Sequence, residues 1–178
     1  MIKFAITNIH KSIDMISKNE YASYFEQYIK FVSTEGKSII DNLVTSQKDF
    51  EDVLRSLPVE KGDYAYAKGK WTLKELIQHI IDTERIFCYR RLCFARNDKT
   101  ELPGFDQDIF VNNGNANELN FYDLLDEMSI LRKGTIQLFK SFSEEALLRK
   151  GIASGNEISV RALGYLFSGH QLHHLNVV

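Results

Sequence analysis

Histidines are concentrated near the end of this chain, where three of its five lie at positions 170, 173 and 174. On a helix, His170 and His174 would project from the same face, one turn apart, with Cβ atoms about 5–6 Å apart. Two imidazoles at that separation can hold one metal ion, but such a pair needs a third ligand. His79, far upstream, is the candidate for that ligand.

The same histidines also have a structural interpretation. A histidine on an apolar helix face is often a hydrogen-bonded core residue. Two of them one turn apart are harder to satisfy, because each buried imidazole needs partners for both nitrogens. His79 alone is also compatible with a place at the boundary of the core. His173 would point about 60–100° away from the pair, which favours a position beside the ligands or at the surface. Spacing alone leaves these interpretations open.

Length and composition indicate one globular domain. The chain has 178 residues, of which 44% are hydrophobic and 26% charged, and this is enough to form a core. Its net charge of −2 argues against a nucleic-acid partner, because phosphate backbones favour a basic surface. No apolar run approaches the roughly 20 residues that span a bilayer, and the N-terminus lacks a signal-peptide pattern. We therefore expect a cytoplasmic protein that binds neither nucleic acid nor membranes.

The two cysteines, Cys88 and Cys93, are not expected to form a disulfide or a metal site. Their spacing is not that of a CxxC motif, and on one helix they would point about 140° apart. We interpret them as reduced thiols. No Ser-His-Asp or Cys-His set is recognisable, so the sequence identifies no catalytic nucleophile.

Four segments have the apolar periodicity of amphipathic helices: residues 38–57, 72–96, 120–142 and 159 onward. N-cap residues mark several of their starts, and Thr72 forms a capping box with Glu75. This pattern predicts an all-α fold, an antiparallel four-helix bundle. Residues 21–178 are expected to form the bundle domain and residues 1–20 an N-terminal tail.

The connections between these helices differ in length and composition. Residues 143–149 are expected to form a short helical turn, and residues 60–69 and 151–156 are expected to be loops. The connection over residues 97–119 is long for a compact domain, and such connections are usually functional or partly helical.

Charged residues interrupt the inward faces of two predicted helices. Glu84 and Arg91 lie on the inward face of the second helix, and Arg132 lies on that of the third. Because charges in a core are rarely left unpaired, we predict a buried ion pair between Glu84 and an arginine, with Arg132 as the favoured partner.

Several motifs share their order and spacing with a known family. They are residues 70–75 (KWTLKE), His79, residues 82–87 (DTERIF), residues 89–90 and 95–96, residues 102–108 (LPGFDQD), residues 161–163, and the histidines at 170, 173 and 174. From about Tyr28 to the C-terminus, the chain resembles the DinB/YfiT-like superfamily. The resemblance implies a four-helix bundle of up-down-down-up topology. It also implies a divalent metal ion held by His79, His170 and His174.

The family resemblance also sets the expected activity. Related families include transferases that use low-molecular-weight thiols such as bacillithiol or mycothiol, and homodimers are plausible among them. We therefore expect a metal-dependent S-transferase or hydrolase that acts on a small molecule. The alternative is a non-catalytic bundle, stapled by the metal, that binds a partner or serves in a stress response. The DNA-damage link in the superfamily name does not imply DNA binding.

The chemistry expected of such a site follows from its ligands. Three neutral imidazoles leave at least one coordination position open, as in catalytic sites. An ion there can polarise a carbonyl group, lower the pKa of water or hold a thiolate. Three nitrogen donors suit zinc, nickel, iron or cobalt, and we favour zinc or nickel.

Nearby carboxylates and the chain end bear on how firmly the ligands are held. Asp82, Asp106 and Asp108 are candidates for orienting the imidazoles, although each is also compatible with simple solvation. His174 lies four residues before Val178, where members of the resembling family usually continue. A ligand in a terminal turn is expected to be held less rigidly.

Overall fold

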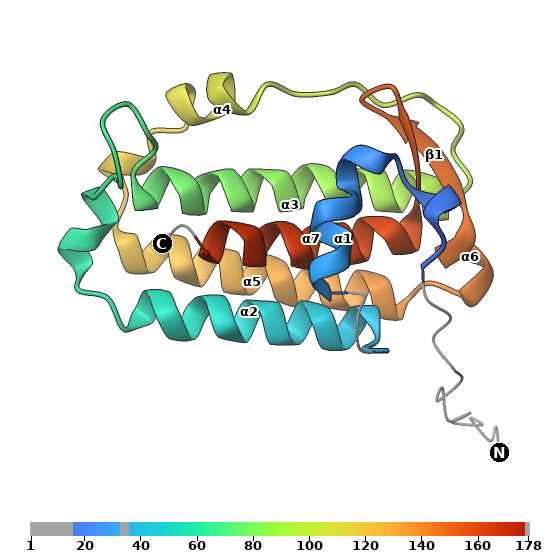
Figure 1. Ribbon diagram of the computed structural model, residues 1–178, viewed down its shortest axis with the longest axis horizontal. Helices are drawn as coiled ribbons and strands as arrows, with labels where there is room; N and C mark the ends of the chain where they lie inside the picture. Colours follow the sequence, from blue (N-terminus) through green and yellow to red (C-terminus); the bar gives the residue numbers. More distant parts are fainter. Residues whose placement is uncertain (1–15, 33–35, 177–178) are drawn as a thin grey trace, which may run out of the picture.

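The computed structural model describes residues 16–32 and 36–176. Its helices are α1 (Glu26–Val32), α2 (Ile39–Arg55), α3 (Leu73–Ala95), α4 (Gln107–Asn113), α5 (Phe121–Lys140), α6 (Glu144–Leu148) and α7 (Val160–Leu175). Its strands are β1 (Lys150–Ala153) and β2 (Asn156–Ser159), and four 3₁₀ turns lie at Lys18–Glu20, Ser23–Phe25, Val59–Asp63 and Ala116–Glu118. The long helices α2, α3, α5 and α7 form the bundle (Figure 1).

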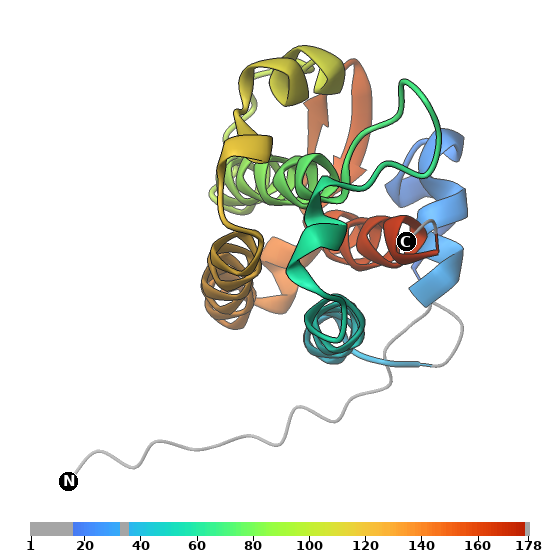
Figure 2. The same ribbon diagram turned by 90° about the vertical axis from the view of Figure 1, so that its left-hand side faces the viewer.

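The four long helices have the predicted up-down-down-up topology. Helices α2 and α7 run in one direction and α3 and α5 in the other (Figure 1). Seen end on, they occupy four corners (Figure 2), and the pairs α2–α7, α3–α5, α2–α5 and α3–α7 are in contact. The antiparallel contact of α3 with α7 places the start of α3 beside the end of α7. None of the described helices is long and apolar enough to cross a membrane.

The predicted helix starts are confirmed. The Thr72 hydroxyl accepts a hydrogen bond from the Glu75 amide (3.2 Å), and the Glu75 carboxylate accepts one from the Thr72 amide (2.7 Å). Asn120 and Ser159 cap α5 and α7 through their side chains. These caps satisfy amide groups that have no partner within the helix, so local sequence fixes where the bundle helices begin.

Three parts of the chain differ from the sequence prediction. Residues 151–156 are not a loop: they belong to the antiparallel hairpin β1–β2, in which Ser154 and Gly155 both have positive φ. Two such residues make the tight turn that suits a hairpin. Helix α1, which was not predicted, packs on α7. Of the expected tail, residues 1–15 lie outside the described residues, whereas residues 16–20 include a 3₁₀ turn, the partly buried Ile16 and the buried Glu20.

The remaining connections agree better with expectation. The connection over residues 97–119 is partly helical, since it contains α4 and a 3₁₀ turn, and its Leu102 bridges to Ala153 of β1. The short turn predicted at residues 143–149 is α6. The expected loop at residues 60–69 begins with a 3₁₀ turn, and Ala65 then pairs with Thr72. This loop lies at the end of the bundle where α3 starts (Figure 1).

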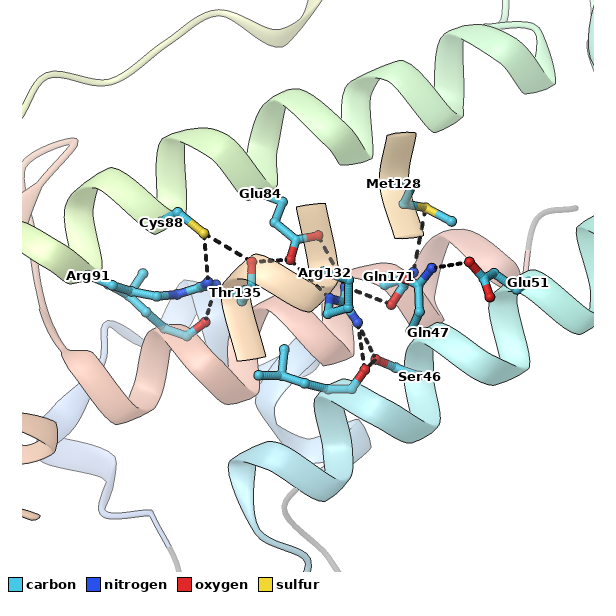
Figure 3. A network of polar contacts seen from close by, with 12 residues as sticks. Ser46, Gln47, Glu51, Glu84, Cys88, Arg91, Met128, Arg132, Thr135 and Gln171 are labelled. Atoms are coloured by element: carbon cyan, nitrogen blue, oxygen red, sulfur yellow. Dashed lines mark hydrogen bonds and ion pairs between the residues drawn. The ribbon is translucent and has the colours of Figure 1, made fainter. Parts of the chain in front are cut away.

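A buried polar network crosses the centre of the bundle (Figure 3). Arg132 Nε donates to Glu84 Oε1 at 3.0 Å, and the two residues are 1% and 0% exposed, which confirms the predicted ion pair. Arg132 also donates to the Leu43 carbonyl (2.8 Å) and to Gln171 Oε1 (3.0 Å). Gln171 Nε2 in turn donates to Gln47 Oε1 at 3.1 Å. The network therefore ties all four bundle helices together.

The guanidinium of the second buried arginine, Arg91, has different partners. Arg91 donates to the Leu163 carbonyl (3.1 Å) and lies over the rings of Phe139 and Phe167. Burial lowers its pKa from the ordinary arginine value. Cys88 and Cys93 are free thiols, as predicted, and Cys88 is within hydrogen-bond distance of Thr135 (3.1 Å).

Candidate metal centre

Three histidines meet at the end of the bundle where α3 starts and α7 ends. His79 lies two turns into α3, and His170 and His174 lie in the last two turns of α7. Because α3 and α7 are antiparallel neighbours (Figure 1), residues distant in sequence face one another here. The i, i+4 spacing on α7 places both of its rings on the side toward α3.

The ring nitrogens are close enough to share one ion. His170 Nε2 lies 3.4 Å from His79 Nε2 and 3.0 Å from His174 Nε2, and the three ligand atoms all lie within 4.8 Å of one another. Two nitrogens bound to one tetrahedral zinc at about 2.0–2.1 Å are about 3.3–3.4 Å apart. The observed spacing therefore fits a single small cation. Within residues 16–32 and 36–176, no other histidine, cysteine or carboxylate completes this group.

The three imidazoles are held in their neutral form. Burial lowers the pKa of His79 to about 4, and the negative charge of Asp108 opposes this effect. Burial, together with His79 and His173, lowers the pKa of His174 to about 3. Burial and the neighbouring histidines lower the pKa of His170 well below its ordinary value. A neutral imidazole keeps the lone pair that a metal ion requires.

Aromatic side chains on two further segments hold the histidine rings in place. The Trp71 ring lies 4.9 Å from that of His79, and the Tyr28 ring of α1 lies 5.5 Å from that of His170, measured between centroids. His170 Nδ1 is buried and has no hydrogen-bond partner in the described part of the chain. The orientation of this ring therefore comes from packing.

Helix α1 approaches α7 closely because of Gly169. A Cβ atom on this residue would overlap the carbonyl oxygen of Tyr28. The absent side chain lets α1 lie against α7 beside His170. Tyr28 is therefore a part of the site that sequence reasoning missed. The available signal was the glycine directly before the histidine, which is unfavourable within a helix unless close packing requires it.

The three candidate carboxylates have different surroundings. Asp82 accepts a hydrogen bond from Gln78 (3.0 Å), and Asp106 caps α4 by accepting from the amides of Asp108 and Ile109. Neither bonds a histidine ring among the described residues, so their expected orienting role is not observed. Asp108 lines the same cavity as His174, and its charge acts on His79.

A cavity of about 620 Å³ adjoins the histidines. Its lining residues come from the loop between α2 and α3, from the start of α3, from the first turn of α4 and from the end of α7, and include Trp71, Leu76, Asp108, His173 and His174. His173 contacts the Tyr28 and His174 rings, with centroids at 5.3 and 5.4 Å, but lies outside the three-histidine group. A small molecule in this cavity would have direct access to His174.

Comparisons with known proteins agree with this architecture. The family model described as the DinB superfamily matches residues 42–178. An Oceanobacillus iheyensis protein named "Putative metal-dependent hydrolase OB0413" is 27% identical over 126 residues, which make up 70% of this chain and 72% of that protein. The solved structure of YfiT from Bacillus subtilis, described as a probable metal-dependent hydrolase with an unusual four-helix bundle topology, has a TM-score of 0.68 and 15% identity. The match covers 95% of this chain and 89% of YfiT, and it supports the fold.

Proposed function

The chain belongs to the DinB superfamily, and on this premise we propose that it is a metal-dependent enzyme acting on a small molecule. His79, His170 and His174 are the proposed ligands, and zinc or nickel is the proposed ion. The observation that carries this proposal is the convergence of three neutral imidazoles, with no fourth protein ligand among the described residues, beside a cavity of about 620 Å³. Structural zinc sites are instead closed by four protein ligands.

The reaction proposed first is hydrolysis, because the similar protein of O. iheyensis is named as a hydrolase. When bound, a divalent ion would polarise a carbonyl group or lower the pKa of water or of a thiol. Trp71 would restrict solvent on one side of His79. Asp108 lines the same cavity, and its carboxylate is the proposed acceptor of a proton from the attacking group.

Transfer to a low-molecular-weight thiol is the second reaction, and it uses the same open position. A thiol such as bacillithiol would take the place of water as the nucleophile, and Asp108 would accept its proton. The two reactions differ in their products, since hydrolysis of an ester or amide yields an acid and an alcohol or amine. In transfer, the new carbon–sulfur bond replaces the bond to the leaving group, so the products are a thioether or thioester conjugate and the released leaving group, which takes up the proton from the thiol.

Metal removal and reloading test the proposal. Protein stripped with a chelator, and then reloaded with zinc or nickel, would be assayed against esters, amides and thiol-conjugation acceptors with and without bacillithiol. We expect turnover after reloading and none in the stripped protein or in the His170→Ala variant. Equal turnover by stripped and reloaded protein, or no turnover by reloaded protein across the whole panel, would contradict the proposal.

A further inference from the structure

The lining of the cavity beside the histidines is basic. Lys61 and Lys70 both line it, and both come from the segment between α2 and α3. Asp108 is the one acidic side chain among its described lining residues. The lining side chains other than histidine therefore carry a net positive charge at neutral pH, even before any metal ion is considered.

Among the described residues, no carboxylate forms an ion pair with either of these lysines. Lys74, close by in the sequence, forms an ion pair with Asp63 (2.8 Å), so this nearby carboxylate is already engaged. For Lys61 and Lys70, the described part of the chain supplies no ion pair with a carboxylate; Lys61 Nζ instead lies 4.6 Å from the centre of the Tyr64 ring. Cationic groups that face a cavity without a counter-charge attract an anion.

Apolar and aromatic side chains make up much of the rest of the cavity wall. Its side chains of this kind are Leu57, Tyr64, Tyr66, Trp71, Leu73 and Leu76. Tyr64 and Tyr66 are 55% and 58% exposed, so much of their ring surface is available to a ligand. Gly69, which has a φ of +75°, allows the chain to turn between Tyr66 and Lys70. Aromatic walls with a few well-placed polar groups are typical of small-molecule sites.

We propose that this cavity binds a small acid, whose carboxylate or phosphate contacts Lys61 and Lys70 and whose apolar body lies against Tyr64, Tyr66 and Trp71. The inference that this acid is the substrate rests on the proposed function, since His174 lines the same cavity. Binding of the acid itself does not require the metal ion. The positive charge of both lysines favours a ligand that carries negative charge.

Trp71 provides a direct measurement of binding. It is the only tryptophan of the chain and it lines the cavity, so its fluorescence reports a ligand there. Metal-free protein would be titrated with 3-phenylpropanoate, with 2-phenylethyl phosphate and with the neutral 3-phenylpropanamide. We expect at least one of the two anions to bind about tenfold more tightly than the amide, which is the effect of one charge-assisted hydrogen bond. The anion that binds more tightly identifies the acidic group.

Variants of the lysines distinguish a direct contact of Lys61 and Lys70 with the anion from a general effect of positive charge on this segment. The double substitution Lys61→Gln and Lys70→Gln is expected to bring the anions and the amide to equal affinity. Lys68→Gln, an exposed lysine of the same segment that does not line the cavity, is the matched control and is expected to retain the preference. All three lysines are exposed, so the fold is expected to persist, as circular dichroism would verify.

Two results would overturn the inference. One is equal binding of both anions and the amide to the wild-type protein, and the other is an undiminished preference for anions in the double variant. Because these titrations use metal-free protein, their outcome is independent of the metal assays. Anion binding without any metal-dependent turnover would support this cavity site and contradict the proposed function. Metal-dependent turnover without anion binding would support the proposed function and contradict this cavity site.

Discussion

His79 Nε2 lies 3.4 Å from His170 Nε2, although the two residues are 91 positions apart in the chain. This contact exists because α3 and α7 are antiparallel neighbours. It also depends on the relative position of the two helices along their axes. Gln171, which directly follows His170, donates to Gln47 and accepts from Arg132 in the bundle core. The site is therefore expected to respond to changes in packing as well as to changes in its ligands.

The contact of α1 with α7 can be tested at Gly169. The substitution Gly169→Ala places a Cβ where the Tyr28 carbonyl oxygen now lies, so α1 must move away from His170. We expect a loss of about 1–3 kcal/mol in the free energy of unfolding, as is typical of overpacking, and weaker zinc binding. Gly134→Ala is the control, because nothing lies within 4 Å of its added Cβ. This control should stabilise α5 by about 0.5–1 kcal/mol. Urea unfolding measures the free energy of unfolding of both variants. Equal values for Gly169→Ala and Gly134→Ala would contradict the packing argument.

The ion pair in the core predicts a large effect at Glu84. Glu84→Gln leaves the buried guanidinium of Arg132 without its carboxylate, and breaking a buried pair in this way costs about 3–5 kcal/mol of stability. The measurement is the free energy of unfolding in urea. Glu145→Gln, which removes an exposed partner of Arg149, should change this value little. A Glu84→Gln variant as stable as the wild type would show that the pair is not structural.

The lowered pKa of Glu20 leads to a prediction of how stability depends on pH. Burial raises the pKa of this carboxyl, but hydrogen bonds from Arg161, Ser17 and Ser159 together bring it below the ordinary value of 4.5. A carboxyl with a lowered folded-state pKa stabilises the protein above its unfolded-state pKa and loses this contribution as pH falls through its folded-state pKa. Wild type should therefore exceed Glu20→Gln in stability at pH 7, and the difference should shrink below about pH 4.5. A difference in unfolding free energy that does not change with pH would disprove this linkage.

Asp108 is the proposed proton acceptor. Asp108→Asn removes the carboxylate and is expected to lower kcat of the metal-loaded protein by about 10²-fold or more, with a smaller change in KM. Asp82→Asn is the matched control, because Asp82 bonds Gln78 and pairs with Arg85, and it should leave kcat nearly unchanged. Steady-state kinetics on the substrate found in the reloading assay provide the comparison. Equal kcat values for both variants would remove Asp108 from the mechanism.

The sequence was most informative where a local pattern determines the structure. Capping residues such as Thr72 and Asn120 predicted the starts of the long helices, because an N-cap satisfies amides that otherwise lack partners. The inward positions of Glu84 and Arg132 predicted their pairing. Spacing identified His170 and His174 as neighbours and left His79 as the candidate third ligand, which the family resemblance then supported. The structure brings the three rings together, and their binding of a metal remains a prediction.

The features that were missed depend on contacts between distant segments. The position of Tyr28 beside His170 follows from the packing of α1 on α7, which periodicity within one segment does not encode. No sequence pattern distinguished Gln171, yet it is fully buried and bonded to two other helices. The hairpin β1–β2 was missed because its strands are short and its turn, Ser154-Gly155, was interpreted as a loop signal.

The most direct test of the proposed site is the zinc content and zinc affinity of the purified protein and of two histidine variants. We predict about one zinc or nickel ion per chain by elemental analysis. Isothermal titration of zinc into the stripped proteins should show that His79→Ala binds zinc at least about a hundredfold more weakly than the wild type. A loss of this size exceeds what is typical when a residue that only hydrogen-bonds a metal ligand is removed. His173→Ala, adjacent to a proposed ligand but outside the group, should bind nearly as wild type does. A wild-type protein without stoichiometric metal, or a His79→Ala variant with wild-type affinity, would contradict the three-histidine site.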